Sequence, residues 1–502
     1  MRRTDSLFQL VKSLNRTDKR NFRLLTQLTS GNKKYLKLFA AIDRQSVYDE
    51  NRLLRQFKGD SMVKQFSVTK NYLYNSILRS LAHFYRGPAV SHSRSALYVR
   101  ILIDKGLQVQ AEKILRKARK RAGSVEDFNE VLDLIGLERE ILRAEENVRD
   151  GGEQTVRMAE EERAATTGLL EIRRYQQMLD EVRLRMLASR HARQPSDVKQ
   201  LATILGDRQM QADYRPGSHR SEGLRLRLQQ CLAIYQNQPA AGIAAGRAVA
   251  VLFAEHKFLR VEWGNLAESA VQDVIRGYIA HGQLVAAEDL LEEVLDQAGT
   301  DCRVARINGA LNRLLLALFR GDPRQSAAIL AEVGTLLREE RDQLPKSVVL
   351  ELCYHAAWMS LVANDAKEAL RWINAFLNEP RSDLRQDLQS NARLLNLLVH
   401  YELGNDDLVE HNLKSTIRFI FKRNRMCQVE RLVVRTVRML IQAKGDGKQE
   451  RILKAMQKEL DLLRKIEFEA TAMETLFLPI WLGGKLQHRP MAELLRLRSR
   501  EV

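Results

Sequence analysis

One short residue pattern occurs five times along this chain of 502 residues. Each copy has a glycine or asparagine, a small or modest residue five positions later, and an aliphatic residue four positions after that. Glycine and asparagine adopt the left-handed conformation of a tight turn at low cost, and a small residue lets a second helix cross the first closely. The pattern therefore predicts helical hairpins, each made of two antiparallel helices.

The copies are spaced almost evenly in the second half of the chain. The turn residues are Gly106, Gly282, Gly321, Asn364 and Gly404. The small or modest residues are Ala111, Ala287, Ser326, Ala369 and Val409, and the aliphatic residues are Leu115, Leu291, Leu330, Ile373 and Leu413. The last four turns follow one another at intervals of 39, 43 and 40 residues. Such spacing is typical of stacked repeats, so we expect an α-solenoid of antiparallel helix pairs.

The composition favours an all-α fold as well. The chain has 9 prolines, well below the usual one in twenty, so few positions force a helix to end. Its commonest residues are good helix formers, and β-branched and aromatic residues form no alternating runs.

This turn-and-small-residue pattern resembles the tetratricopeptide repeat superfamily, in which a glycine ends the first helix and an alanine on the second packs against it. The resemblance covers residues 97–122 and 270–425, with a spacing near 40 that indicates an irregular member. It implies an α-solenoid that binds proteins or peptides on a concave face. Residues 1–85 also resemble bacterial repeat proteins that carry no assigned activity.

Composition and periodicity divide the chain into four parts. Residues 1–86 are predicted to form a small basic helical module, ending at the Gly, Pro and Ser residues of Arg86–Ser95. Residues 96–192 are predicted to form helical repeats with long charged helices, broken at Asp150–Gly152. The solenoid is expected at residues 222–482, and residues 483–502 are expected to form a C-terminal capping helix and tail.

The positive charge is concentrated at the amino terminus. Residues 1–90 contain 18 Lys and Arg against 6 Asp and Glu, a net +12 of the +18 of the whole chain. A second basic stretch, His411–Lys444, has nine Lys and Arg and one acid, Glu430. Such an excess is expected of a surface that meets phosphates or an acidic protein, although solvated helix faces give the same pattern. The candidate binding residues are Lys64, Lys70, Arg79, Arg86, Lys414, Arg418, Lys422 and Arg423.

The segment Met62–Leu81 admits two interpretations. As a helix-turn-helix, it would start a recognition helix at Ser67 and present Lys70, Asn71, Tyr74, Asn75 and Arg79 to a DNA groove. As one continuous helix, it would simply pack its apolar side on the module. No Gly or Pro marks a turn at 66–68, so the continuous helix is favoured.

Two other features admit both a structural and a functional interpretation. Gly242 and Gly246 have the GxxxG spacing of close helix contacts, which favours packing within the solenoid because charged residues follow. Trp358 and Trp372 fall on successive repeat helices and fit either the core or a binding groove, with the core favoured.

Motifs for catalysis are absent. The sequence has no GxxxxGK[ST], HExxH or GxSxG, and the histidines lack partners at metal-ligand spacing. Four widely separated cysteines predict reduced thiols. We expect no enzyme activity, cofactor, metal or membrane span, and a cytoplasmic location.

Two functions remain open. The first is a scaffold or adaptor that binds a protein or peptide on the helical repeats. The second is a nucleic-acid-associated regulator that docks DNA, RNA or a ribosome through residues 1–86. The sequence leaves the oligomeric state open.

Overall fold

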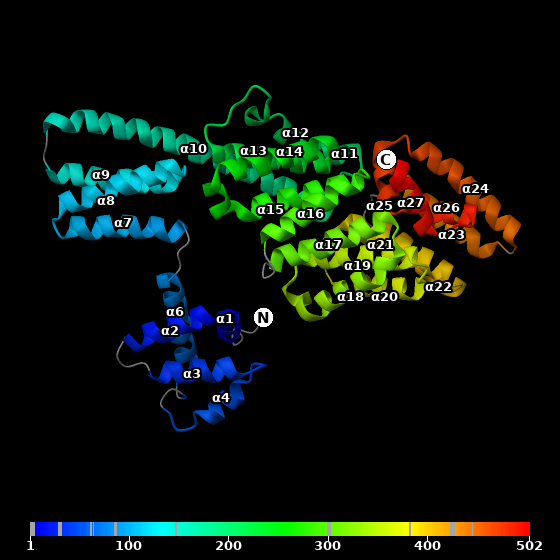
Figure 1. The fold of residues 1–502 in the computed structure, drawn as a ribbon, viewed down its shortest axis with the longest axis horizontal. Coiled ribbons are helices and arrows are strands. Elements are labelled where there is room, and N and C mark those ends of the chain that lie inside the picture. Colours follow the sequence, from blue (N-terminus) through cyan, green and yellow to red (C-terminus); the bar gives the residue numbers. More distant parts are fainter. Residues whose placement is uncertain are drawn as a thin grey trace. The chain divides into compact units, whose positions relative to one another are not determined.

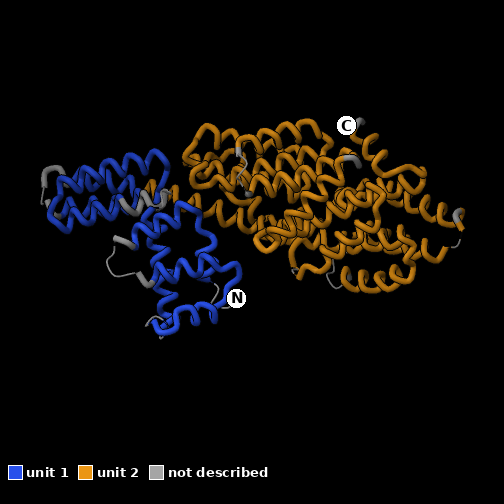
Figure 2. Tube along the Cα trace, turned by 60° about the horizontal axis from the view of Figure 1, so that its bottom comes forward, with its two compact units in different colours: residues 1–162 blue, residues 163–502 orange. Residues whose placement is uncertain are grey.

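In the computed structural model, the described residues form α-helices and short 3-10 helices, with no strand among them (Figure 1). The structure describes residues 6–28, 33–60, 63, 65–84, 88–145, 148–298, 303–380, 383–421, 427–443 and 445–501. The predicted all-α class is confirmed. The chain divides into two compact units, residues 1–162 and 163–502 (Figure 2).

Short helices at the start of the first unit share one apolar core. They are α1 (Ser6–Ser13), α2 (Arg16–Leu28), α3 (Lys33–Arg44), α4 (Glu50–Gln56) and α6 (Phe66–Phe84). Helix α6 contributes Phe66, Leu73 and Ile77 to this core, because these residues recur on one side of the helix. Helix α6 begins at Phe66, directly after a turn at Gln65, so the described part of 62–81 is one unbroken helix only from residue 66 onward. This start lies one residue before the Ser67 expected for a recognition helix, and residues 61, 62 and 64 lie outside the described residues.

The rest of the first unit consists of longer helices that pack in sequence. They are α7 (Pro88–Asp104), α8 (Gln108–Ser124), α9 (Phe128–Glu145) and the first part of α10 (Val148–Ala188). Helix α7 begins inside Arg86–Ser95, where a break was predicted, because proline suits the first turn of a helix.

Helix α10 continues through Asp150–Gly152, where the sequence also predicted a break. Each glycine costs a helix only about 1 kcal/mol. Ion pairs that join Arg119 of α8 to Glu161, and Arg139 of α9 to Glu162, help to hold α10 in place. Because α10 is continuous, the division between the two units lies inside it and does not coincide with the predicted boundaries at residues 86, 192 and 222.

The second unit is a stack of helix pairs followed by helices that return over it. Between α10 and the stack lie α11 (Pro195–Lys199), α12 (Ala202–Leu205) and the 3-10 helix Arg208–Met210. The pairs are α13 (His219–Tyr235) with α14 (Pro239–Glu255), α15 (Lys257–Ala280) with α16 (Leu284–Ala298), α17 (Arg303–Arg320) with α18 (Pro323–Glu340), α19 (Lys346–Val362) with α20 (Ala366–Leu377), α21 (Gln386–Glu402) with α22 (Asp406–Phe421), and α23 (Gln428–Gln442) with α24 (Asp446–Leu463). A 3-10 helix, Arg341–Gln343, follows α18, and the last helices are α25 (Glu467–Thr475), α26 (Leu478–Gln487) and α27 (Met491–Glu501).

The odd-numbered helices from α13 to α23 form a continuous inner row, since each packs against the next odd-numbered one. The even-numbered helices α14 to α24 lie on the outside of this row. Helices of the inner row are buried on most sides, as in α19, where every residue from Val349 to Val362 except His355 is buried. The predicted solenoid-like stack is thus present.

The five predicted turn residues all have the left-handed conformation, with φ of 71° at Gly106, 72° at Gly282, 63° at Gly321, 64° at Asn364 and 69° at Gly404. In each turn the following N–H donates to a carbonyl five residues back, as Gln283 does to Tyr278 O at 2.9 Å. This bond closes a Schellman motif, which ends the first helix of the pair.

The structure adds two turns of the same kind that the sequence pattern missed. Asn237, with φ of 58°, joins α13 to α14, and Glu126, with φ of 52°, joins α8 to α9. The small residues that follow the five predicted turns are all buried, with exposures of 0% at Ala111, Ala287, Ala369 and Val409 and 4% at Ser326. The predicted register of the helical hairpins is therefore correct.

Candidate functional site

The inner row of the second unit is covered by the end of its own chain. Phe477, which precedes α26, lies against Phe319 of α17 and Trp358 of α19, with ring centroids 5.2 and 5.4 Å apart. Tyr354 of α19 donates a hydrogen bond to Thr475 O at 2.7 Å. Trp358 is fully buried here and does not line a groove.

Helix α27 packs on α17 instead of extending the stack. Ala492 and Leu495 of α27 are buried, and Ala492 O comes so close to Gly321 that a Cβ at this glycine would lie 2.4 Å from it. Helix α27, which lies within the segment 483–502 predicted as a capping helix and tail, therefore folds back over the α17–α18 turn.

A second cover is the segment 187–193, which consists of the last two residues of α10 and the residues that follow it. Backbone hydrogen bonds fix it at both ends: Arg385 N–H donates to Leu187 O at 2.8 Å, and Ala192 N–H donates to Tyr235 O at 2.7 Å. Between them, the His191 ring nitrogen Nδ1 lies 2.8 Å from Ile234 O. The segment thus bridges the end of α13 and the start of α21.

A network of ion pairs lies beneath this segment. Asp273 of α15 accepts from Arg190 and from Arg227 of α13, both at 2.8 Å. Glu351 of α19 pairs with Arg276 of α15 at 3.1 Å and with Arg385. Arg385 also pairs with Asp387 of α21 at 2.8 Å, and Arg193 pairs with Glu430 of α23.

The ion-pair partners and burial together determine which side chains of the network are ionised. Burial raises the pKa of Glu351, but Arg276 and Arg385 outweigh it and lower the pKa to about 2. Burial likewise opposes ionisation of Asp273, yet Arg190 and Arg227 hold its pKa well below the usual range. Burial lowers the pKa of His191 and of His355 to about 4, so both rings are neutral at pH 7. The network joins five inner helices and the segment 187–193, and it has no sequence motif, because its members come from separate elements.

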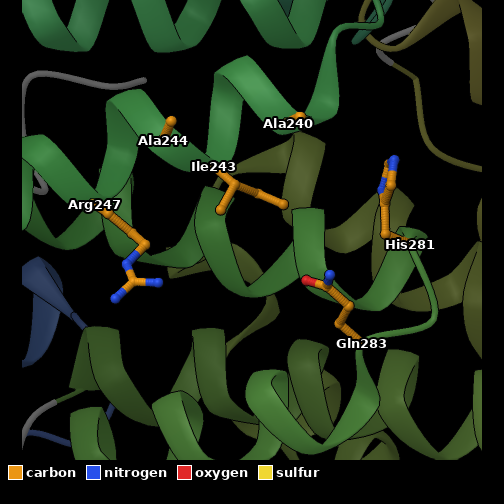
Figure 3. Close-up of a pocket in the computed structure, with 6 residues that line it drawn as sticks. All are labelled: Ala240, Ile243, Ala244, Arg247, His281 and Gln283. Carbon is orange, nitrogen blue, oxygen red and sulfur yellow. The ribbon is translucent and has the colours of Figure 1, made fainter.

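The outer side carries an open hollow of about 490 Å³ between α14 and the α15–α16 turn (Figure 3). Its lining residues are Ala240, Ile243, Ala244 and Arg247 from α14 together with His281 and Gln283 from the turn. Figure 3 shows the Ile243 side chain between the two ends of the hollow, with Arg247 at one end and His281 at the other. Arg247 Nη1 donates to Tyr278 Oη at 3.3 Å.

The face of α14 beside this hollow is exposed and, apart from Arg247, apolar. Ala240, Ala244 and Val251 lie on it at helical spacing, and Val251 is 56% exposed. An ordinary outer helix is polar on its solvent side, so this face is an unusual surface for the stack.

The predicted basic residues have different surroundings. The Lys70 side chain is only 13% exposed, and its Nζ lies 2.5 Å from Glu50 Oε2 and above the rings of Tyr48 and Phe66. Arg79 is exposed on α6, and Lys414 and Arg418 are exposed one turn apart on α22. Four others, Lys64, Arg86, Lys422 and Arg423, lie outside the described residues.

Within the ranges given above, no group of three or more His, Cys, Asp and Glu residues could hold a metal ion. Three of the four cysteines, Cys231, Cys353 and Cys427, are buried free thiols, and burial raises the pKa of Cys353 to about 12 and that of Cys427 to about 11. Over the same part of the chain, no helix is long and apolar enough to cross a membrane.

A comparison with models of known protein families finds no match, and neither does a comparison with curated protein sequences.

Proposed function

We propose that this protein is a non-enzymatic scaffold that binds a protein partner on its outer helix row, across the face of α14 and the adjoining hollow. One observation carries the proposal: α14 is apolar on nearly all sides and still lies at the surface. Contiguous exposed apolar surface is typical of interaction sites, since water contact with it is unfavourable.

The chemistry of the hollow favours a protein or peptide over a small polar ligand. Ala240, Ile243 and Ala244 form an apolar floor, and Arg247 and His281 supply polar groups at the rim. A partner helix with small apolar residues and a carboxylate would match this arrangement. The inner row would not take part, because the segment 187–193 and α25–α27 already pack on it.

The ionised groups of the interior support a structural role. Asp273 pairs with Arg227 and Arg190, and Glu351 pairs with Arg276. These ion pairs lie beneath the segment 187–193. Such pairing fixes the relative positions of inner helices, as a rigid binding platform requires.

The finer assignment is also a proposal: the stack is an irregular member of the tetratricopeptide-like superfamily, and its location is cytoplasmic. The left-handed turns and the buried small residues support the first part. The buried free thiols of Cys231, Cys353 and Cys427 support a reducing compartment.

The test compares protein partners captured by the full chain and by two variants after nuclease treatment. Ala244→Glu places a charge on the apolar face of α14, where the side chain is exposed and the fold tolerates it. Ala331→Glu makes the same change at an exposed position of α18. We expect quantitative mass spectrometry to show a stoichiometric partner that Ala244→Glu loses and Ala331→Glu retains. Partners lost equally with both variants, or only with nuclease, would contradict the proposal.

A further inference from the structure

The outer face of α6 in the first unit is a second unusual surface, separate from the proposed scaffold site. Phe66, Leu73 and Ile77 anchor the opposite side of the helix in the core. The outer face carries Val68, Asn71, Asn75, Leu78 and Arg79, all exposed and spaced three, four, three and one residues apart. Asn71, Asn75 and Arg79 form a row of hydrogen-bonding groups along this face.

Further cations lie on the neighbouring helix α2, while carboxylates of the same group of helices are engaged in local contacts. One exposed side of α2 carries Arg16, Arg20 and Arg23. Helix α2 as a whole packs against α6. By contrast, Asp43 pairs with Lys19 at 2.7 Å, and Glu50 pairs with Lys70.

Two other carboxylates accept hydrogen bonds from backbone N–H groups at helix starts. Asp49 accepts from Arg52 N–H at the start of α4, and Asp18 accepts from Asn15 N–H at the start of α2. Among the described residues of α2, Arg16 and Arg20 have no carboxylate partner. The positive excess seen in the sequence is therefore present at the surface of the folded helices.

The separation of neutral and charged groups distinguishes between two polyanionic partners. An acidic protein would be matched best by cations along the exposed row itself. The row instead offers two neutral amides and one guanidinium, with further cations on a neighbouring helix. Duplex DNA shows the same separation of neutral and charged groups, because its base edges are neutral and its phosphates flank the groove.

The dimensions of α6 also suit the major groove of duplex DNA. Helix α6 has 19 residues, which is about 28 Å at 1.5 Å per residue. The major groove of DNA, about 12 Å wide, admits a helix, whereas the narrow major groove of duplex RNA excludes side chains. From Asn71 to Arg79 the row spans about 12 Å, or three to four base pairs.

We propose that the helices α1 to α4 together with α6 bind duplex DNA, with α6 in the major groove. Asn71, Asn75 and Arg79 face base edges, and Arg16 and Arg20 face phosphates. Lys70 does not contribute, because Glu50 neutralises it. This function goes beyond the proposed scaffold and uses a different unit of the chain.

The test measures binding of the full chain to a labelled pool of random 20-base-pair duplexes by fluorescence anisotropy, followed by selection and sequencing of the bound duplexes. Single-stranded RNA of the same length and polyglutamate serve as competing probes. We expect tight duplex binding at low salt, poor binding of both other probes, and enrichment of a short sequence.

Two double variants separate the proposed contacts. Arg16→Gln with Arg20→Gln should weaken binding and reduce the slope of log affinity against log salt by about 1.8, or 0.9 per phosphate contact. Asn71→Ala with Asn75→Ala should leave that slope unchanged and abolish the sequence enrichment. Alanine raises helix propensity at these exposed positions, so the fold is retained. Lys414→Gln with Arg418→Gln, which removes the same charge from α22, is the control and should change neither quantity.

Several results would overturn the proposal. They are absence of duplex binding at low salt, enrichment that survives the asparagine changes, and a salt slope altered as much by the α22 control as by the α2 variant. Preferred binding of polyglutamate would assign the surface to an acidic protein instead. A loss of partners in the α14 experiment has no bearing on these outcomes, so the two proposals fail independently.

Discussion

Three glycines allow α13, α14 and α15 to pack closely. A Cβ at Gly246 would lie 2.2 Å from Gln230 Nε2 and 2.5 Å from Val274 Cγ2, and a Cβ at Gly277 would lie 2.9 Å from Ile243 Cγ1. Gly242 and Gly246 stand five and nine positions after Asn237, where the other hairpins have a small and an aliphatic residue. Close packing within the solenoid, predicted from the GxxxG spacing, is confirmed.

Gly246→Ala should therefore destabilise the second unit. Overpacking costs about 1–3 kcal/mol, which exceeds the gain in helix propensity of about 1 kcal/mol. Urea denaturation followed by circular dichroism measures the change. Gly447→Ala in α24, where a Cβ meets nothing within 4 Å, is the control. Equal stability of the two variants would show that α14 is not packed this closely.

Two histidines in the ion-pair network make stability depend on pH. The folded-state pKa of His191 and of His355 is about 4, below the value of about 6.5 expected in the unfolded chain. The unfolded chain therefore binds more protons between these values, and the free energy of unfolding falls as pH decreases from about 6.5 to about 4.

Each ring contributes at most about 1.4 kcal/mol per pH unit in this window. Because both histidine residues are partly exposed, the measured loss should be smaller. Glu351, with a pKa of about 2 and an ordinary value of 4.5, loses its stabilising charge only at lower pH. Urea denaturation from pH 7 to 4 should show a shallower decline for His355→Gln than for the unchanged chain. Parallel curves would mean that His355 is not neutralised by burial.

At the scale of the elements, each predicted hairpin carries a buried residue five positions after its turn. In the α19–α20 pair this is Ala369, which is 0% exposed, whereas Lys367 two residues earlier is exposed. Ala369→Phe should overpack the helix crossing and cost about 1–3 kcal/mol. Lys367→Phe should change the free energy of unfolding little. Equal effects in denaturation experiments would show that the register of α20 is wrong.

The helices and five of the turns could be predicted because their causes are local. A left-handed residue such as Asn364 and a small residue such as Ala369 act within one hairpin and recur at fixed spacing. The Asn237 turn was missed because glycine replaces the aliphatic residue at 246. The break predicted at Asp150–Gly152 was wrong because contacts with α8 and α9 outweigh the helix propensity of two glycines.

The candidate sites were predictable only in part. An excess of Lys and Arg identifies a basic module, but it does not reveal that Glu50 neutralises Lys70 while Arg79 stays exposed. The ion pairs of Asp273 and Glu351 join elements far apart in sequence, so no spacing identifies them. The exposed face of α14 was not predicted from the sequence for a different reason. A helix made mostly of apolar residues is normally assigned to the core.

At the scale of the second unit, the central feature is that the inner helix row is closed by the chain itself. The concave binding face implied by the resemblance to tetratricopeptide repeats is occupied by the segment 187–193 and by α25–α27. For this reason our proposal places the partner elsewhere, on the exposed face of α14.

Hydrogen–deuterium exchange of the full chain tests this closure most directly. The amide of Ala192 donates to Tyr235 O and that of Arg385 to Leu187 O. If the segment is docked as described, peptides that cover 187–193 should exchange as slowly as those of α19 in the core. Exchange within seconds in that segment, while α19 stays protected, would mean that the inner row is open and available to a partner.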